Sequence, residues 1–169
     1  MEPNHTQFTS SAPDRDAAPA LPAPRAQSVL LVEDNDDSRT MLSLFLSMEA
    51  HRVHEATNGP DGVAAAIAQQ FDVAFIDIGL SGFDGFEVAR QIRAAEAQQR
   101  RAPARLIALT GYSREDYQRR SVEAGFNLHL VKPVDIETIT GVLATTDLTT
   151  LSRATREPAA PRCQEMPGL

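Results

Sequence analysis

Carboxylates end two separate apolar runs in this sequence of 169 residues. Glu33 and Asp34 close the run that begins at Ser28, and Asp77 closes the run that begins at Asp72. Two or three converging carboxylates form a hard oxygen site suited to Mg²⁺, which takes few protein ligands and keeps several waters. A carboxylate can also act as a covalent nucleophile. These residue types therefore point to phosphoryl chemistry with a divalent cation.

Two more polar residues follow apolar runs later in the chain, and both suit a phosphoryl group. Thr110 ends the run Arg105–Thr110, and Lys132 follows the run Asn127–Val131. A hydroxyl and an ammonium can donate hydrogen bonds to phosphoryl oxygens and neutralise their charge. Lys132 is also the only lysine among 16 basic residues. Since arginine serves everywhere else, an ordinary surface charge is a weak explanation for this lysine.

Apolar runs and helical patterns alternate along the middle of the chain, which predicts a doubly wound α/β fold. Such a fold has a five-stranded parallel sheet flanked by five helices, and ligands bind at the carboxyl ends of its strands. The acids, Thr110 and Lys132 should therefore share one edge of the sheet. We expect strands at Ser28–Glu33, Arg52–Ala56, Asp72–Asp77, Arg105–Thr110 and Asn127–Val131. We expect helices at Asp36–Glu49, at Asp61–Gln70, from Phe86 onward, from Ser113 or Arg114 to Ala124, and from Asp135 to about Ala144.

Composition divides the chain into three parts. Residues 1–27 are rich in Ala, Pro, Ser and Thr, and residues 147–169 resemble them. Segments of this kind bury too little apolar surface to offset the entropy lost on ordering. We expect a disordered arm at 1–27, one folded domain at 28–146 and a flexible tail at 147–169.

Charge and hydropathy argue against several classes of protein. The formal net charge of −7 argues against nucleic-acid binding. Apolar runs are shorter than a membrane span, and the N-terminus lacks the pattern of a secretory signal. The single cysteine, Cys163, cannot form an internal disulfide. We expect a cytoplasmic protein that binds neither nucleic acid nor membrane.

Five short motifs resemble the receiver domain of bacterial two-component response regulators. They occur in order over about residues 28–146, and they are Leu30–Asp34 (LLVED), Phe75–Asp77 (FID), Gly82–Gly85 (GFDG), Ala108–Gly111 (ALTG) and Lys132–Pro133 (KP). The resemblance implies a flavodoxin-like sheet with strand order 2-1-3-4-5.

The resemblance also implies a role for each residue at the sheet edge. Asp77 is the expected phosphoacceptor and a ligand of Mg²⁺. Asp34 is expected to bind Mg²⁺ directly, Glu33 mainly through water, and Gly79 through its carbonyl oxygen. These residues form the predicted metal site.

Thr110 is expected to carry the switch hydroxyl that moves to the phosphoryl group. Lys132 is expected to form an ion pair with the phosphoryl group. The Lys132–Pro133 bond resembles the cis peptide of the family, an isomer that X–Pro bonds adopt at modest cost.

The sequence departs from the family pattern at two positions. Ser81 replaces the usual proline of the loop after the acceptor, which bears on loop rigidity. His129 stands at the position of the switch aromatic, either as a switch that adds pH sensitivity or as an ordinary strand histidine. Tyr112, two residues after Thr110, is expected to influence the access of water to the phosphoryl group.

The leading interpretation is a stand-alone receiver that accepts a phosphoryl group from a sensor histidine kinase or a histidine phosphotransfer protein. It would act through an unknown protein partner, as a monomer or a phosphorylation-dependent homodimer, and catalyse only its own phosphorylation and dephosphorylation. A haloacid-dehalogenase-like phosphatase is the main alternative, but Gly79 stands where that chemistry needs a second aspartate as general acid. A phosphorylation-independent interaction module is the third alternative, and the intact acids argue against it.

Overall fold

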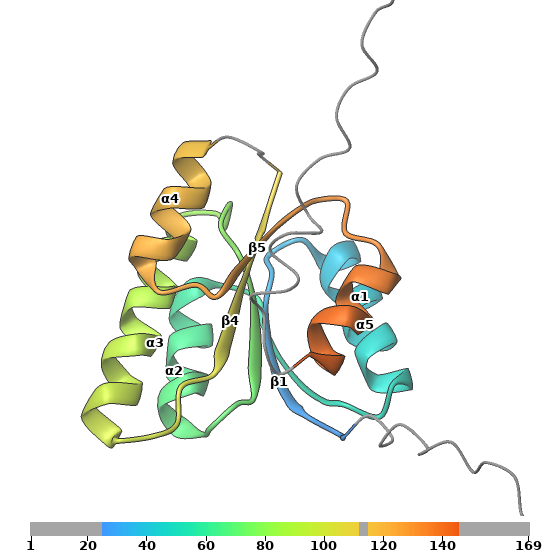
Figure 1. Cartoon of the computed structure of the whole chain (residues 1–169), viewed down its shortest axis with the longest axis horizontal. Coiled ribbons are helices and arrows are strands. Elements are labelled where there is room, and N and C mark those ends of the chain that lie inside the picture. Colours follow the sequence, from blue (N-terminus) through green and yellow to red (C-terminus); the bar gives the residue numbers. More distant parts are fainter. Residues whose placement is uncertain (1–24, 112–114, 146–169) are drawn as a thin grey trace, which may run out of the picture.

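The computed structural model describes residues 25–111 and 115–145, which contain a parallel sheet of five strands. The strand order is β2-β1-β3-β4-β5, so the chain winds outward from β1 in both directions (Figure 1). The predicted order is confirmed. The strands are β1 (Ser28–Val32), β2 (Arg52–Ala56), β3 (Val73–Asp77), β4 (Arg105–Thr110) and β5 (Leu128–Val131).

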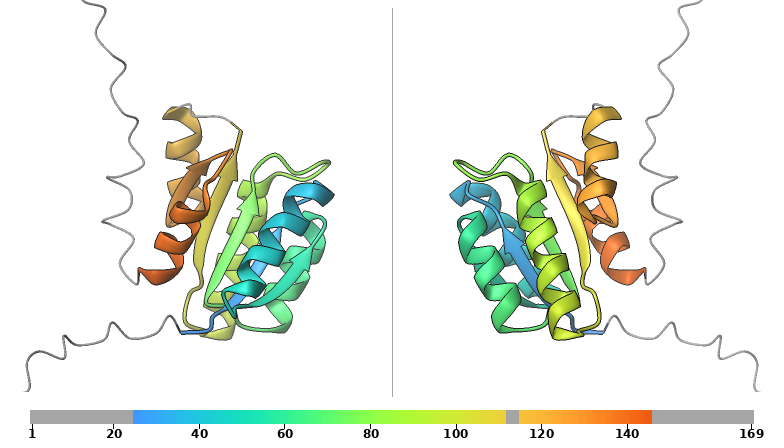
Figure 2. Two further views of the ribbon diagram at one scale, coloured as in Figure 1. Left: turned by 90° about the vertical axis from the view of Figure 1, so that its right-hand side faces the viewer. Right: turned by 90° about the vertical axis from the view of Figure 1, so that its left-hand side faces the viewer.

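Five helices cover the two faces of this sheet. Figures 1 and 2 show α2, α3 and α4 on one face and α1 and α5 on the other, which is the doubly wound arrangement that the sequence predicts. The helices are α1 (Asp36–Met48), α2 (Gly59–Ala68), α3 (Gly85–Gln99), α4 (Glu115–Ala124) and α5 (Ile136–Ala144).

Strand β1 shows how the sequence builds two cores from one run of apolar residues. Leu30 and Val32 belong to the hydrophobic cluster under α2 and α3, whereas Val29 and Leu31 belong to the cluster under α1 and α5. All four side chains are fully buried. Because side chains alternate between the faces of a strand, a central strand covered on both sides needs a continuous apolar run.

Four helices begin at a residue whose side chain accepts a hydrogen bond from the first turn. The N-caps are Asn35, Asn58, Asp84 and Asp135 for α1, α2, α3 and α5. Such caps satisfy backbone N–H groups that have no partner inside the helix. The caps of α1, α3 and α5 lie a few residues beyond the ends of β1, β3 and β5, so they also fix the segments that leave the sheet at its carboxyl edge.

Element boundaries differ from the sequence expectations by one or two residues. Gln27, which the sequence assigns to the arm, is tied to the folded part: its side chain bonds Leu143 O at 2.7 Å and accepts from Arg105 at 2.6 Å. Tyr112, the expected start of α4 at Ser113 or Arg114, residues 1–24 and the tail from 147 lie outside the described residues. Within the described ranges, none of the helices has the length and apolar character needed to cross a bilayer.

Candidate functional site

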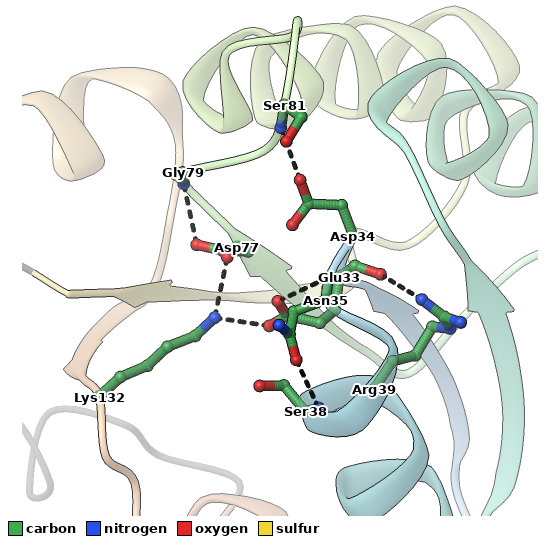
Figure 3. A network of polar contacts seen from close by, with 9 residues as sticks. All are labelled: Glu33, Asp34, Asn35, Ser38, Arg39, Asp77, Gly79, Ser81 and Lys132. Carbon is green, nitrogen blue, oxygen red and sulfur yellow. Dashed lines mark hydrogen bonds and ion pairs between the residues drawn. The ribbon is translucent and has the colours of Figure 1, made fainter.

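The carboxyl ends of β1, β3 and β5 bring Glu33, Asp77 and Lys132 together (Figure 3). Lys132 Nζ lies 2.6 Å from Glu33 Oε2 and 2.8 Å from Asp77 Oδ2, so the ammonium bridges the two carboxylates. Glu33 is buried, and the side chain of Asp77 is 11 % exposed. The sequence expectation that these residues meet at one edge of the sheet is correct.

Asp34 faces the same site and is held from the loop that follows β3. Its Oδ2 accepts a hydrogen bond from the backbone N–H of Ser81 at 2.7 Å. Hydrogen bonding to Ser81 holds the pKa of Asp34 below its ordinary value. The carboxylate is therefore kept ionised and oriented. Ser81 stands at the position of the usual loop proline. A proline has no N–H there and could not make this contact.

The loop after β3 packs tightly against the phosphoacceptor candidate. The N–H of Gly79 donates to Asp77 Oδ1 at 2.8 Å, which fixes one carboxylate oxygen. At the start of α3, a Cβ on Gly85 would lie 2.3 Å from Asp77 O and 2.6 Å from Ile78 Cα. Only glycine permits this approach of the helix start to the end of β3, so Gly85 sets the path of the loop.

Burial and neighbouring charges shift two pKa values at the site. Desolvation, together with repulsion from Asp77, raises the pKa of Glu33 although hydrogen bonding to Lys132 opposes the shift. Burial alone would lower the pKa of Lys132, but its bonds to Asp77 and Glu33 raise it above the ordinary value. Lys132 therefore carries its charge at neutral pH and offsets part of the negative charge around it.

The donor set fits a divalent cation. Glu33, Asp34 and Asp77 each offer an oxygen, and these oxygens all lie within 4.8 Å of one another. One ammonium faces three carboxylates, so a hard cation with oxygen preference would relieve the remaining repulsion. Gly79, the fourth ligand implied by the resemblance, lies beside Asp77 in Figure 3.

Thr110 lies at the end of β4 and is 2 % exposed. Its carbonyl oxygen accepts from Lys132 N–H at 2.7 Å, so the two residues are fixed to each other through their main chains. Thr110 and Gly79 also line a cavity of about 350 Å³ between the loop after β3 and α4. The Lys132–Pro133 peptide bond is cis, as the resemblance implies.

His129, in place of the family's aromatic, connects β5 to α4. Its Nδ1 lies 2.9 Å from Ser121 Oγ, and the hydroxyl of the buried Ser121 also donates to Tyr117 O at 2.8 Å. This contact is compatible with both roles that the sequence leaves open for His129.

An apolar groove runs from the site along α1. Its volume is about 530 Å³, and Glu33 and Lys132 line its end at the site. Apolar side chains of α1 and α5 form its walls, and the most exposed of them are Met41 at 76 % and Ile136 at 59 %. An exposed apolar groove beside a charged site is suited to contact with another protein.

Arg39 is a site neighbour that sequence reasoning does not identify. Its guanidinium donates to the carbonyl oxygen of Glu33 at 3.0 Å. Its position on α1, one turn after Asn35, is the only sequence signal that could have found it, because helical residues four apart lie on the same face.

A scan against protein-family models matches residues 29–144 to the response regulator receiver domain. The chain belongs to this family. The receiver match covers more than half of the chain and includes every residue of the site described above.

Among curated proteins, this receiver is 38 % identical over 107 residues to the transcriptional regulatory protein AfsQ1 of Streptomyces coelicolor, covering 63 % of this chain and 45 % of AfsQ1. It also matches the regulatory protein ResD of Bacillus subtilis at 32 % identity, covering 62 % of this chain and 41 % of ResD. The chain thus spans less than half the length of these relatives.

Among solved structures, the receiver domain of the sensor histidine kinase PA1611 from Pseudomonas aeruginosa, with a magnesium ion coordinated in its active-site cleft, is 31 % identical. The match covers 70 % of this chain and 95 % of that one, with a TM-score of 0.62. The co-crystal structure of the Saccharomyces cerevisiae histidine phosphotransfer protein Ypd1 with the receiver domain of Ssk1 matches at 28 % identity, over 72 % and 94 % of the chains, with a TM-score of 0.67.

Proposed function

We propose that this receiver is a Mg²⁺-dependent phosphoacceptor switch in which Asp77 takes a phosphoryl group from a phosphohistidine. The observation that carries the proposal is the placement of Asp77, whose Oδ1 is held by Gly79 and whose Oδ2 lies 2.8 Å from Lys132. A nucleophilic carboxylate needs this combination of orientation and nearby positive charge.

In the proposed transfer, a carboxylate oxygen of Asp77 attacks phosphorus and forms the acyl-phosphate bond. The P–N bond to the donor imidazole breaks, and its electron pair returns to the ring nitrogen. Lys132 then pairs with the incoming phosphoryl oxygens, and the Thr110 hydroxyl donates to one of them. Exchange of the Lys132–Asp77 ion pair for a Lys132–phosphoryl pair keeps the ammonium compensated throughout.

Glu33, Asp34, Asp77 and the carbonyl of Gly79 are the residues that would hold Mg²⁺, and the bound ion would offset the negative charge of the phosphoryl group. The fit of the carboxylate cluster supports this assignment, as does the magnesium ion in the related Pseudomonas aeruginosa receiver domain. Gly79 leaves no side-chain acid two residues after Asp77, which supports a reversible switch over a phosphatase with turnover.

The proposed donor is a sensor histidine kinase or a histidine phosphotransfer protein. Support comes from the Ypd1–Ssk1 complex among the related structures and from the apolar groove that joins the site. The output is a change in protein binding that follows from Thr110 and the β5 region of a cytoplasmic receiver. A phosphorylated homodimer is one form that this output could take.

The test is incubation of the full chain with acetyl phosphate and Mg²⁺, followed by intact mass. The wild type should gain one phosphoryl group, Asp77→Asn should gain none, and the exposed Asp116→Asn on α4 should label like the wild type. A chelator should abolish labelling. A wild type that stays unlabelled while another receiver labels would refute the proposal, and many turnovers of a small phosphomonoester would favour the phosphatase.

A further inference from the structure

Arg39 binds the short segment that carries two acids of the site, Glu33 and Asp34 (Figure 3). Its Nη1 donates to the carbonyl oxygen of Glu33 at 3.0 Å, and its Nη2 donates to Asp36 Oδ1 at 2.5 Å. The side chain is 12 % exposed, although it lies on the first turns of a surface helix. A long cationic side chain held this far from water has its position fixed by its partners.

The third nitrogen of the guanidinium contacts β2. Arg39 Nε lies 3.3 Å from Glu55 Oε2, and the other oxygen of Glu55 accepts from Ser43 Oγ at 2.6 Å. Each nitrogen of Arg39 therefore has its own acceptor, one on the β1–α1 segment, one on α1 and one on β2. Because the guanidinium is planar and rigid, these three contacts fix its orientation as well as its position.

The Glu33 carbonyl is the functionally important acceptor of the three. Glu33 lies just beyond β1, and its N–H donates to Ala56 O at 3.1 Å. Because Arg39 donates to its carbonyl oxygen, both main-chain polar groups of Glu33, the N–H and the C=O, are hydrogen-bonded. The side chains of Glu33 and Asp34 both project from this short segment toward Asp77 (Figure 3). A shift of its main chain would displace two carboxylates at once.

Direct electrostatic action of Arg39 on the site is a weaker explanation. Two carboxylates, those of Asp36 and Glu55, already compensate its single positive charge. The net field that the group exerts on the acidic cluster is therefore small. Its effect on the site must act mainly through the position of the Glu33 main chain.

We propose that Arg39 is a positioning residue for cation binding: by holding the carbonyl of Glu33, it keeps the Glu33 and Asp34 carboxylates within reach of the ion that Asp77 shares. The proposal rests on the proposed function insofar as the acidic cluster binds Mg²⁺. Partners that orient metal ligands from outside typically contribute 10–100-fold to metal affinity, and we expect about tenfold here because the contact is to the main chain.

The experiment is calorimetric titration of the full unphosphorylated chain with Mg²⁺, repeated with Mn²⁺ by electron paramagnetic resonance. Arg39→Ala should weaken affinity about tenfold. Ser43→Ala is the matched control, because it removes the other contact to Glu55 and leaves the Glu33 carbonyl untouched; its affinity should stay within about twofold of the wild type. Arg39→Lys keeps the charge but cannot reach three acceptors at once, and should fall between the two.

Thermal unfolding of each variant identifies loss of fold, and Arg39→Lys gives the decisive comparison if Arg39→Ala does not fold. Unchanged Mg²⁺ affinity in folded Arg39 variants, or equal weakening by Ser43→Ala, overturns the proposal. Labelling by acetyl phosphate at saturating Mg²⁺ separates the two hypotheses. If the wild type labels normally and Arg39→Ala binds Mg²⁺ normally, only the role of Arg39 is refuted. If the wild type binds no Mg²⁺ and does not label, the proposed function is refuted.

Discussion

Lys132 Nζ lies 2.8 Å from Asp77 Oδ2, although 55 residues separate the two in the chain. The contact exists because β5 and β3 end at the same edge of the sheet, with β4 between them. It places the only lysine of the sequence against the proposed phosphoacceptor. The same ammonium also contacts Glu33, so it holds together two carboxylates that would otherwise repel.

Replacement of Lys132 by methionine should slow labelling by acetyl phosphate about 100-fold, because the phosphoryl group loses a positioned donor and its positive charge. Lys132→Arg keeps the charge but replaces a compact ammonium by a planar fork, and should label at an intermediate rate. The rate is measured by intact mass against time at saturating Mg²⁺. Labelling of folded Lys132→Met at the wild-type rate would contradict the role of this residue.

Gly85→Ala should destabilise the fold by about 1–3 kcal/mol, since its Cβ would meet backbone atoms at the end of β3. The change should also slow labelling of Asp77 by displacing the strand end. Gly111→Ala is the matched control, because a Cβ there meets no described residue within 4 Å. Urea unfolding gives the comparison, and equal stability of the two variants would show that the loop adapts.

His51 should make the stability of the fold pH-dependent. Burial lowers the pKa of this histidine, while Glu49 opposes the shift in part, and its Nδ1 accepts from Gln27 N–H at 3.1 Å. The pKa of His51 in the folded state lies below the ordinary 6.5, so the unfolded chain binds more protons than the folded chain once the pH falls below 6.5. The contribution of the neutral His51 to folding stability is therefore present above pH 6.5 and is lost as the pH falls below it.

Urea midpoints should therefore fall more for the wild type than for His51→Gln between about pH 7.5 and about pH 5. The exposed His54→Gln on β2 serves as the control and should keep the wild-type dependence. The same slope in the wild type and in His51→Gln would exclude His51 as the source.

Met41→Asp should impair transfer from a protein donor while sparing transfer from a small one. Met41 is exposed in the groove beside the site, where a donor protein can pack as its phosphohistidine reaches Asp77. We expect about a tenfold slower transfer from a phosphorylated histidine phosphotransfer protein that labels the wild type, equivalent to about 1.4 kcal/mol.

Labelling of Met41→Asp by acetyl phosphate should be unchanged, because the highly exposed Met41 is neither an acid of the carboxylate cluster nor a donor to it. Ile67→Asp, an exposed apolar position on α2 outside the groove, is the matched control and should behave as the wild type with both donors. Equal slowing with both donors would indicate damage to the site instead of lost docking.

Much of this receiver could be predicted from local features of its sequence. Apolar runs and turn residues placed the strands to within one or two residues, and the helix expected from Asp135 begins at Ile136 with Asp135 as its N-cap. The types of Asp34, Asp77 and Lys132, together with their positions after strands, indicated a cation and a phosphoryl group. The strand and helix predictions are confirmed because strand periodicity and capping depend on neighbours in the sequence, whereas the cation and the phosphoryl group stay predictions.

The tertiary structure alone decided which groups of different elements meet. Arg39 reaches the Glu33 carbonyl, the Ser81 N–H orients Asp34, and Ser121 contacts His129 because sheet twist and helix packing bring separate elements together. Apart from the position of Arg39 one helical turn after Asn35, these contacts follow no spacing rule in the sequence, since their distances depend on how separate elements pack. The sequence by itself therefore determined which residue types end the strands, and the packing of β1, α1, β2 and the loop after β3 determined how the acids are held.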